Sequence, residues 1–430
     1  MEMATSPNEF VQSIKDQVLS LRAQMDVRNS WLKQRLDEVI PQLMEREGID
    51  MWIVACREYN EDPVILSLLP QPSMSARRRM VLVFSRKTDS SVERLVVGRY
   101  GLGEFYTAAW NPEQEDQETA LARVIRERDP RSIGINVAEE FAFGDGLSHN
   151  EYQWLSSSIG DSLMDRTTSA ERLAVGWLER RISPELAVYP GIVSIGHQII
   201  AEAFSSRVIR PGITTTDDVV WWMRQTMQDA GLQAWFPPTI DIQAAGEGAS
   251  GPGVAGTSRK TILPGDMLHC DMGFIYLGLA TDQQQLAYVL KPGETDVPAG
   301  LKAGLAIGNR FQDIHLEEMR LGRTGNDVLH SILAQSTSEG IKPSLYTHPL
   351  GFHGHAAGPV IGLWDHQEGV PGRGDYEVFD DTCYSIEFNV RADVPEWGGQ
   401  EVVFALEEDA VLSGGKARFL DGRQERFHII

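Results

Sequence analysis

Four carboxylates in the second half of this 430-residue chain lie inside, or at the ends of, apolar strand-like stretches: Asp271, Asp282, Glu387 and Glu407. A lone charged side chain in such a strand is costly to bury, and four carboxylates brought together repel one another unless cations lie between them. With the imidazole of His348, the set offers mostly oxygen and one nitrogen, which suits two divalent cations. The chain therefore predicts a fold that joins distant strands around two metal ions, as in a binuclear metallohydrolase.

The first two carboxylates belong to one predicted hairpin. We expect a strand over Met267–Ile275, a tight bend at Gly278 and a return strand over Ala280–Leu290. Such a hairpin can set Asp271 opposite Asp282, and cross-strand neighbours lie roughly 5 Å apart. Either aspartate alone could instead cap a turn or pair with an arginine. Both together inside apolar strands favour carboxylates that bridge or flank a pair of cations.

Three histidines fall within eight positions, His348, His353 and His355, in the stretch THPLGFHGHAAG. Neutral imidazole is the commonest transition-metal ligand and the commonest proton shuttle near neutral pH. The glycines between the histidines allow the backbone to crowd around a small site. An ordinary surface loop is the alternative for a stretch of this composition.

Two further predicted strands carry the glutamates. The strand Cys383–Val390 has Glu387 near its middle, and the strand Val402–Leu412 has Glu407 followed by Glu408. Because side chains alternate along a strand, Glu407 and Glu408 must point to opposite faces, and only one of them can face a common site. Exposed glutamates of an edge strand are the alternative. A carboxylate inside a strand usually has a partner, and here a metal ion is the expected one.

The composition restricts the partners and the compartment. Lys and Arg number 39 against 61 Asp and Glu, and the formal charge of -22 disfavours nucleic acid or an anionic membrane as a partner. Cys56, Cys270 and Cys383 are far apart in the sequence, which favours reduced thiols over a disulfide framework. The polar N-terminus has no apolar segment typical of a signal peptide, and no apolar run approaches membrane-spanning length. We therefore expect a cytoplasmic protein.

The pattern along the chain predicts two domains. Alternating strands and helices between residues 8 and 137 indicate an α/β domain. Amphipathic helices are then expected over Ser169–Arg181, over Pro190–Phe204, and in a third segment that ends at Ala230 before Gly231. Strands and turns dominate from Trp235 onward. We place the boundary near residue 165, which divides the chain into domains 1–165 and 166–430.

The order Asp, Asp, His, Glu, Glu resembles that of the pita-bread metallohydrolases, in particular their creatinase, prolidase and aminopeptidase P branch. The family's strand pair, with two Asp eleven positions apart, is similar to DMGFIYLGLATD, where 282 − 271 = 11. Its stretch with a metal-binding His and a substrate-side His seven positions later is similar to HPLGFHGH, where 355 − 348 = 7. The last two Glu segments resemble SIEFNV and FALEEDAVL. The resemblance covers roughly residues 165 to 430. It implies an α+β fold, a pita-bread catalytic domain preceded by an α/β creatinase-like N-terminal domain.

The resemblance also implies roles for these residues. Two divalent ions would be bound by Asp271, Asp282, His348, Glu387 and Glu407. Manganese is expected by analogy, and zinc, cobalt or iron would fit the same ligands. A water or hydroxide would bridge the ions, with Glu387 as its general base and His355 stabilising the tetrahedral intermediate or orienting the substrate. The segment GHAAG resembles the family's Gly-His-x-x-Gly, which leaves open a second register with His355 as the ligand. A homodimer is expected.

The implied reaction is cleavage next to proline in short peptides, of the aminopeptidase P or prolidase type. Three positions depart from the peptidase pattern. An upstream substrate-side His would fall near Val254, and no His occurs between Gln243 and Pro264. Arginines of the pattern are replaced by Gln285 and Ala405. These departures leave open a small-molecule C–N hydrolase of the creatinase or ectoine hydrolase kind, or a metal-dependent lyase. A metal-free binding module is disfavoured because all five ligand types are present.

Overall fold

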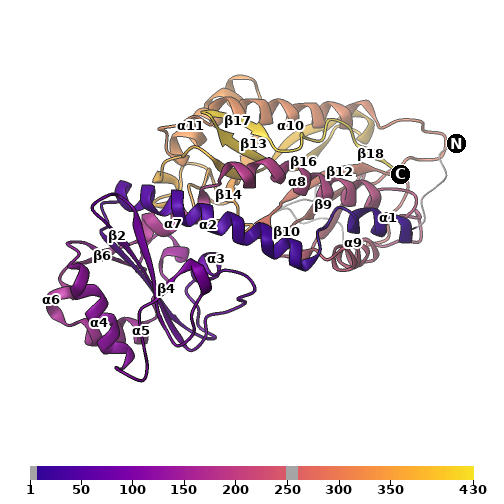
Figure 1. Ribbon diagram of the computed structural model, residues 1–430. Helices are drawn as coiled ribbons and strands as arrows, with labels where there is room; N and C mark the ends of the chain where they lie inside the picture. Colours follow the sequence, from indigo (N-terminus) through magenta and orange to yellow (C-terminus); the bar gives the residue numbers. More distant parts are fainter. Residues whose placement is uncertain (1–6, 248–259) are drawn as a thin grey trace. The chain divides into compact units, whose positions relative to one another are not determined.

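The computed structural model describes residues 7–247 and 260–430, and the chain divides into two compact units (Figure 1). One unit spans Ser20–Ile182, and the other combines the N-terminal segment up to Leu19 with Ser183–Ile430. The sequence placed the boundary near residue 165 instead. The division lies later because helix α7 (Glu171–Glu179) packs on α2 (Leu21–Arg46), where the missing side chain of Gly176 leaves room for Leu43.

The unit Ser20–Ile182 is an α/β domain, as the sequence predicted. Its sheet has the strand order β4-β3-β2-β1-β5-β6, with β1 antiparallel to β2 and parallel to β5. The strands are β1 (Met51–Arg57), β2 (Arg79–Arg86), β3 (Val92–Gly98), β4 (Thr107–Ala108), β5 (Ile133–Ile135) and β6 (Thr167–Ser169). In addition to α2 and α7, the domain contains the helices α3 (Ile65–Leu68), α4 (Gln117–Arg128), α5 (His149–Ile159) and α6 (Asp161–Met164). It also contains the short 3₁₀ turns η1 (Gly103–Phe105) and η2 (Ala142–Gly144).

The second unit contains the predicted carboxylates. Its helices are α1 (Pro7–Lys15), α8 (Ser183–Ala203), α9 (Thr216–Ala230), α10 (Ala299–Glu318) and α11 (Gly325–Ser338), with η3 (Arg373–Asp375) and η4 (Pro395–Trp397). Helix α9 ends at Ala230, as expected, because Gly231 adopts the left-handed conformation with φ 82°. Thr215 caps its N-terminus through a capping box with Asp218.

The main sheet of this unit has the strand order β13-β15-β16-β12-β9-β8, and β14, β17 and β18 join it at β15, β16 and β12. Its strands are β8 (Thr239–Gln243), β9 (Met267–Met272), β12 (Gln283–Tyr288), β13 (Pro343–Leu345), β14 (His348–Leu350), β15 (Thr382–Val394), β16 (Gln400–Ser413), β17 (Lys416–Phe419) and β18 (His428–Ile429). A small second sheet has the order β11-β10-β7, from β7 (Gln233–Ala234), β10 (Phe274–Tyr276) and β11 (Leu279–Ala280).

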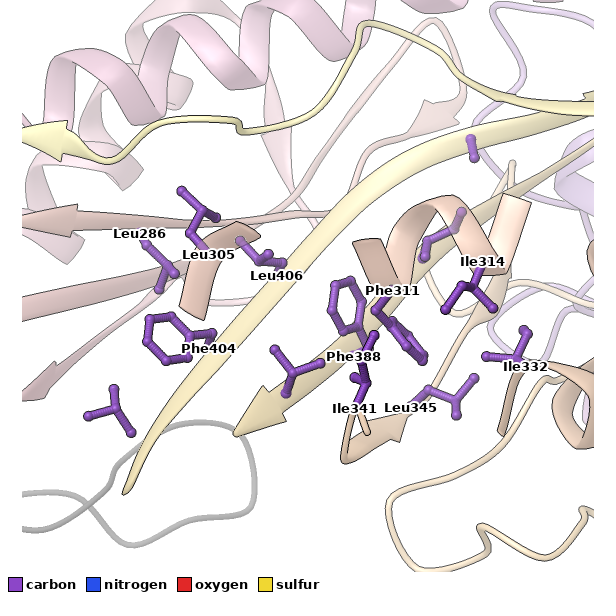
Figure 2. Close-up of a cluster of buried hydrophobic side chains, with 14 of the residues drawn as sticks. Leu286, Leu305, Phe311, Ile314, Ile332, Ile341, Leu345, Phe388, Phe404 and Leu406 are labelled. Carbon is purple, nitrogen blue, oxygen red and sulfur yellow. The ribbon is translucent and has the colours of Figure 1, made fainter. Parts of the chain in front are cut away.

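The core of this unit lies where α10 packs on β15 and β16. Figure 2 shows Phe404 and Leu406 of β16 beside Leu305 of α10, and Phe388 of β15 beside Phe311, with ring centroids 4.6 Å apart. Each such side chain contributes roughly 1.5–3 kcal/mol when it is fully buried. Because side chains alternate, the residues between them, which include Glu387 and Glu407, point to the other face of the sheet.

The hairpin of the two aspartates differs in detail from the expectation. The predicted strand Met267–Ile275 breaks at Gly273 into β9 and β10, which belong to different sheets. A side chain at Gly273 would collide with the Thr281 carbonyl and the indole of Trp235. The return strand β12 begins after Asp282, and the cross-strand partner of Asp271 is Gln284 rather than Asp282.

Within residues 7–247 and 260–430, no helix is both long enough and apolar enough to cross a bilayer.

Candidate metal centre

One row of side chains crosses four neighbouring strands of the main sheet. In the strand register, Glu387 of β15 pairs with Glu407 of β16, Glu407 pairs with Gln284 of β12, and Gln284 pairs with Asp271 of β9. These strands come from residues 267–288 and 382–413, and the sheet makes them neighbours. Paired residues point to the same face of a sheet, so the register alone brings three of the predicted carboxylates together.

Asp282 and His348 complete the cluster from positions beside this row. Asp282 immediately precedes β12, and His348 begins β14, where it pairs with Ser385 of β15. The structure therefore brings together all five residues that the sequence predicted as ligands. Among the described residues, ligand atoms lie within 4.8 Å of one another in three overlapping groups: Asp271, Asp282 and Glu407; His348, Glu387 and Glu407; and Asp282, His348 and His355.

The cluster is buried and strongly acidic. Burial, followed by the nearby Glu407 carboxylate, raises the pKa of Asp271, Asp282 and Glu387 well above their usual values. Each of these carboxylates is therefore unfavourable in its charged form unless a cation compensates it. Within the described part of the chain, Asp271 Oδ1 and Asp282 Oδ1 are buried without a hydrogen-bond partner.

The contacts of the two ring nitrogens of His348 are a second observation that bears on whether the cluster suits metal ions. Its Nδ1 lies 3.0 Å from the carbonyl oxygen of Pro349, to which it donates a hydrogen bond, so the lone pair of a neutral ring is on Nε2. That Nε2 lies 3.3 Å from Glu407 Oε1 and 3.6 Å from Asp282 Oδ2. An imidazole nitrogen and carboxylate oxygens that meet in one buried place form a donor set that suits divalent metals. The residues present therefore fit a metal centre.

Several polar residues that the sequence analysis did not single out hold the carboxylates. Gln284 donates to Glu387 Oε1 at 2.8 Å and to Glu407 Oε2 at 2.7 Å. Ser385 Oγ donates to Glu407 Oε1 at 2.6 Å, and the backbone N–H of Asp282 donates to Asp409. The run DQQQ could have indicated Gln284, because an uncharged amide inside an apolar strand also needs a partner.

His355 lies at the border of the cluster and is exposed. Its ring packs against the rings of His348 at 4.7 Å, Trp235 at 5.2 Å and Tyr346 at 5.6 Å between centroids. Burial against these neighbours, and the adjacent His348, lower the pKa of His355 to about 4. The imidazole is therefore neutral at pH 7 and can donate or accept one hydrogen bond at each nitrogen. Among the described residues, His353 belongs to none of the three groups.

The predicted separation of Glu407 from Glu408 is confirmed. Glu407 belongs to the acidic cluster, whereas Glu408 contacts His197 of α8 at 2.7 Å and accepts a hydrogen bond from Gln285 at 3.1 Å. Burial alone would lower the pKa of His197, but the carboxylates of Glu408 and Asp421 outweigh it and raise the pKa to about 9.

The three departures from the peptidase pattern lie in different places. Val254, the position expected for a substrate-side His, lies outside the described residues. Gln285 bonds to Glu408 and to His428, on the face away from the cluster. Ala405 pairs with Asn389 on the face of Glu387 and Glu407, two residues along each strand.

The fold and this arrangement of carboxylates define a two-domain protein of the pita-bread class, with a candidate metal centre in its second unit. Residues 192–412 match the profile of metallopeptidase family M24. The match covers just over half of the chain, and the protein belongs to this family. A search of curated proteins found no match.

Solved structures of similar fold cover nearly the whole chain. An X-Pro aminopeptidase from Thermotoga maritima is 16% identical, with a TM-score of 0.63 over 90% of this chain and 99% of that one. An Xaa-Pro dipeptidase from Bacillus anthracis is 15% identical, with a TM-score of 0.60 over 93% and 100%. A dipeptidase from Mycobacterium ulcerans is 14% identical, with a TM-score of 0.63 over 94% and 98%. The predicted fold, a pita-bread catalytic domain preceded by an α/β domain, is confirmed.

Proposed function

We propose that this protein is a dinuclear metal-dependent hydrolase that cleaves short peptides next to proline. The observation that carries the proposal is the convergence of His348 Nε2 with Asp282 and Glu407 inside a buried set of carboxylates. Membership of a metallopeptidase family supports hydrolysis of peptides. The names of the similar structures, Xaa-Pro peptidases and a dipeptidase, support proline specificity.

The groups of nearby ligand atoms suggest how the residues would divide between two ions. Asp271, Asp282 and Glu407 would hold one, and His348, Glu387 and Glu407 the other. Manganese is the ion we expect. Bound divalent ions lower the pKa of water and polarise a carbonyl group.

The protein's own residues would supply the proton transfers and the positioning. Glu387 would accept the proton of the attacking water as the general base. His355, neutral at pH 7, would donate a hydrogen bond to the carbonyl oxygen of the scissile bond as negative charge develops there. Trp235 and Tyr346, which both pack against His355, would form an apolar wall for a ring such as that of proline.

A second candidate function is favoured by the departures at Gln285 and Ala405. Ala405 lies on the same face of the sheet as Glu387 and Glu407. The chain therefore lacks a cationic side chain at the position where the resemblance implies an arginine. A small neutral amide, or an amidine that itself carries positive charge at neutral pH, would not need such a cation. A C–N hydrolase acting on a small molecule, or a metal-dependent lyase, is therefore the alternative.

A substrate screen separates the two functions. The metal-stripped protein would be reconstituted with Mn²⁺ and assayed on Xaa-Pro dipeptides and tripeptides, on matched Xaa-Ala peptides, and on small amides and amidines. We expect release of the residue next to proline, with the Xaa-Ala series cleaved roughly tenfold more slowly, the scale of discrimination by a hydrophobic pocket. Activity confined to the small amides would favour the alternative. Activity on neither set, in a protein that binds Mn²⁺, would contradict both.

A further inference from the structure

Two consecutive glutamines of β12 each connect a histidine to a glutamate, on opposite faces of the strand. Gln284 is fully buried; its Nε2 contacts Glu387 and Glu407, and its Oε1 lies 2.9 Å from Nε2 of His269. Gln285 is also buried; its Nε2 contacts Glu408, and its Oε1 lies 2.7 Å from Nε2 of His428. Only the first of these chains reaches the candidate metal centre.

The hydrogen bonds of Gln284 determine its orientation. A side-chain amide has two N–H donors on one nitrogen, and here each donor meets a carboxylate on a different strand. A flipped amide would place its oxygen against both carboxylates, which is electrostatically unfavourable. The oxygen therefore faces His269, whose Nε2–H donates to it, and Nδ1 of that ring makes a long contact of 3.4 Å to Asp241.

We propose that Gln284, supported by His269, is a positioning residue that orients Glu387 and Glu407 for metal binding. The terminal torsion of a glutamate is broad, so an isolated carboxylate samples many orientations. One planar amide bonded to both side chains holds one oxygen of each glutamate. The other oxygen of Glu407, Oε1, lies 3.3 Å from His348 Nε2. Partners of this kind, behind the ligands themselves, typically contribute 10–100-fold to metal affinity.

The chemistry of an amide suits this position better than that of a cation. An arginine or lysine in contact with Glu387 and Glu407 would neutralise them and oppose the binding of a metal ion. The amide of Gln284 satisfies one oxygen of each carboxylate without adding charge, so the negative charge remains available. The positioning role depends on the proposed metal centre. The test must therefore distinguish a centre that binds no metal from a Gln284 side chain that does not orient the ligands.

The test compares Gln284→Met with the matched control Gln285→Met in the full-length protein. Both substitutions remove a buried amide of β12 that is bonded to a glutamate on another strand. Only the side chain of Gln284 faces the candidate metal centre. Mn²⁺ binding to the metal-stripped proteins would be measured by calorimetry, and thermal unfolding without metal would measure the structural effect. We expect Gln284→Met to weaken Mn²⁺ binding about 10–100-fold and Gln285→Met to change it less than about threefold.

Equal weakening in the two variants, or unchanged affinity in Gln284→Met, would overturn the positioning role. If Gln284→Met fails to fold, His269→Phe removes the donor behind the amide, and we expect it to weaken Mn²⁺ binding roughly threefold to tenfold; unchanged affinity there would overturn the inference. Asp282→Asn distinguishes a failure of the positioning role from a failure of the proposed metal centre. If the wild-type protein binds no Mn²⁺, or Asp282→Asn binds it equally tightly, the metal centre itself is wrong.

Discussion

The imidazole of His348 shows at the scale of one residue why the cluster suits a cation. A single hydrogen bond to the neighbouring Pro349 carbonyl determines which ring nitrogen carries the proton. The other nitrogen then faces Glu407 and Asp282, inside a buried cluster where burial already disfavours charged carboxylates. The same burial that makes the metal-free cluster unfavourable makes a bound cation strongly favourable.

This balance predicts opposite effects of one substitution on stability and on binding. Asp282→Asn removes one of the repelling carboxylates, so we expect the metal-free protein to unfold about 2–4 °C higher. The same variant should lose tightly bound Mn²⁺ and activity together, because Asp282 belongs to two of the three ligand groups. Calorimetric unfolding with chelator, and metal analysis after purification without chelator, measure the two effects. A fully active, metal-replete variant would contradict the assignment.

His355 should behave differently from the ligands. We expect His355→Ala to retain Mn²⁺ but to lower turnover by about a hundredfold, the scale typical of one positioned donor or acid–base group. Metal content and kcat would be measured on the same preparation. Loss of metal from this variant would instead favour the register in which His355 is the ligand.

At the scale of elements, the close approach of α10 to β16 positions the strands that carry the glutamates. A side chain at Gly304 would collide with the ring of Phe404, so the helix can lie this close only because glycine is present. Leu305 and Phe311 of the same helix pack on this face of the sheet (Figure 2). The face opposite this packing is the one that holds Glu387 and Glu407.

We therefore predict that Gly304→Ala destabilises the protein by about 1–3 kcal/mol through overpacking. Gly191→Ala is the matched control, because Gly191 lies in helix α8, is exposed and has open space around its Cβ position. There the substitution should be neutral or stabilise by up to about 1 kcal/mol. Urea unfolding measures both values, and equal effects at the two positions would refute the packing argument.

At the scale of the whole molecule, interactions between distant segments hold the second unit together. His197 of α8 lies between Glu408 of β16, at 2.7 Å, and Asp421 near the end of the chain, at 2.9 Å. These contacts join residues more than 200 positions apart. A helix, a central strand and the C-terminal segment are thereby coupled through one imidazole.

This imidazole predicts a pH dependence of stability. The pKa of His197 is about 9 in the folded protein, above the roughly 6.5 of an unfolded histidine. Its contribution, at most about 3 kcal/mol, is therefore complete below pH 6.5 and is lost as the pH rises through 9. His197→Gln should remove this dependence, measured as the difference in unfolding free energy between pH 6.5 and 9.5. An identical pH profile in the variant would exclude the role.

Much of the candidate site could be predicted from the sequence because its signals are local. A carboxylate inside an apolar strand indicates a partner wherever it occurs, and strand alternation alone separated Glu407 from Glu408. Gln284 could not be assigned, because its partners Glu387 and Glu407 come from strands more than 100 residues away. The pairing of Asp271 with Gln284 rather than with Asp282 likewise follows from the point at which β12 begins, after Asp282.

The sequence by itself determined the residue types, the order and spacing of the acidic positions, and the face of each strand on which they lie. These follow from side-chain chemistry and from the two-residue period of a strand. The tertiary structure decided which of those positions meet, which hydrogen bonds orient them, and that residues 166–182 and the N-terminal segment up to Leu19 belong to different units than the sequence suggested. Such pairings depend on how distant segments of the chain pack together, and a local sequence pattern does not predict that packing.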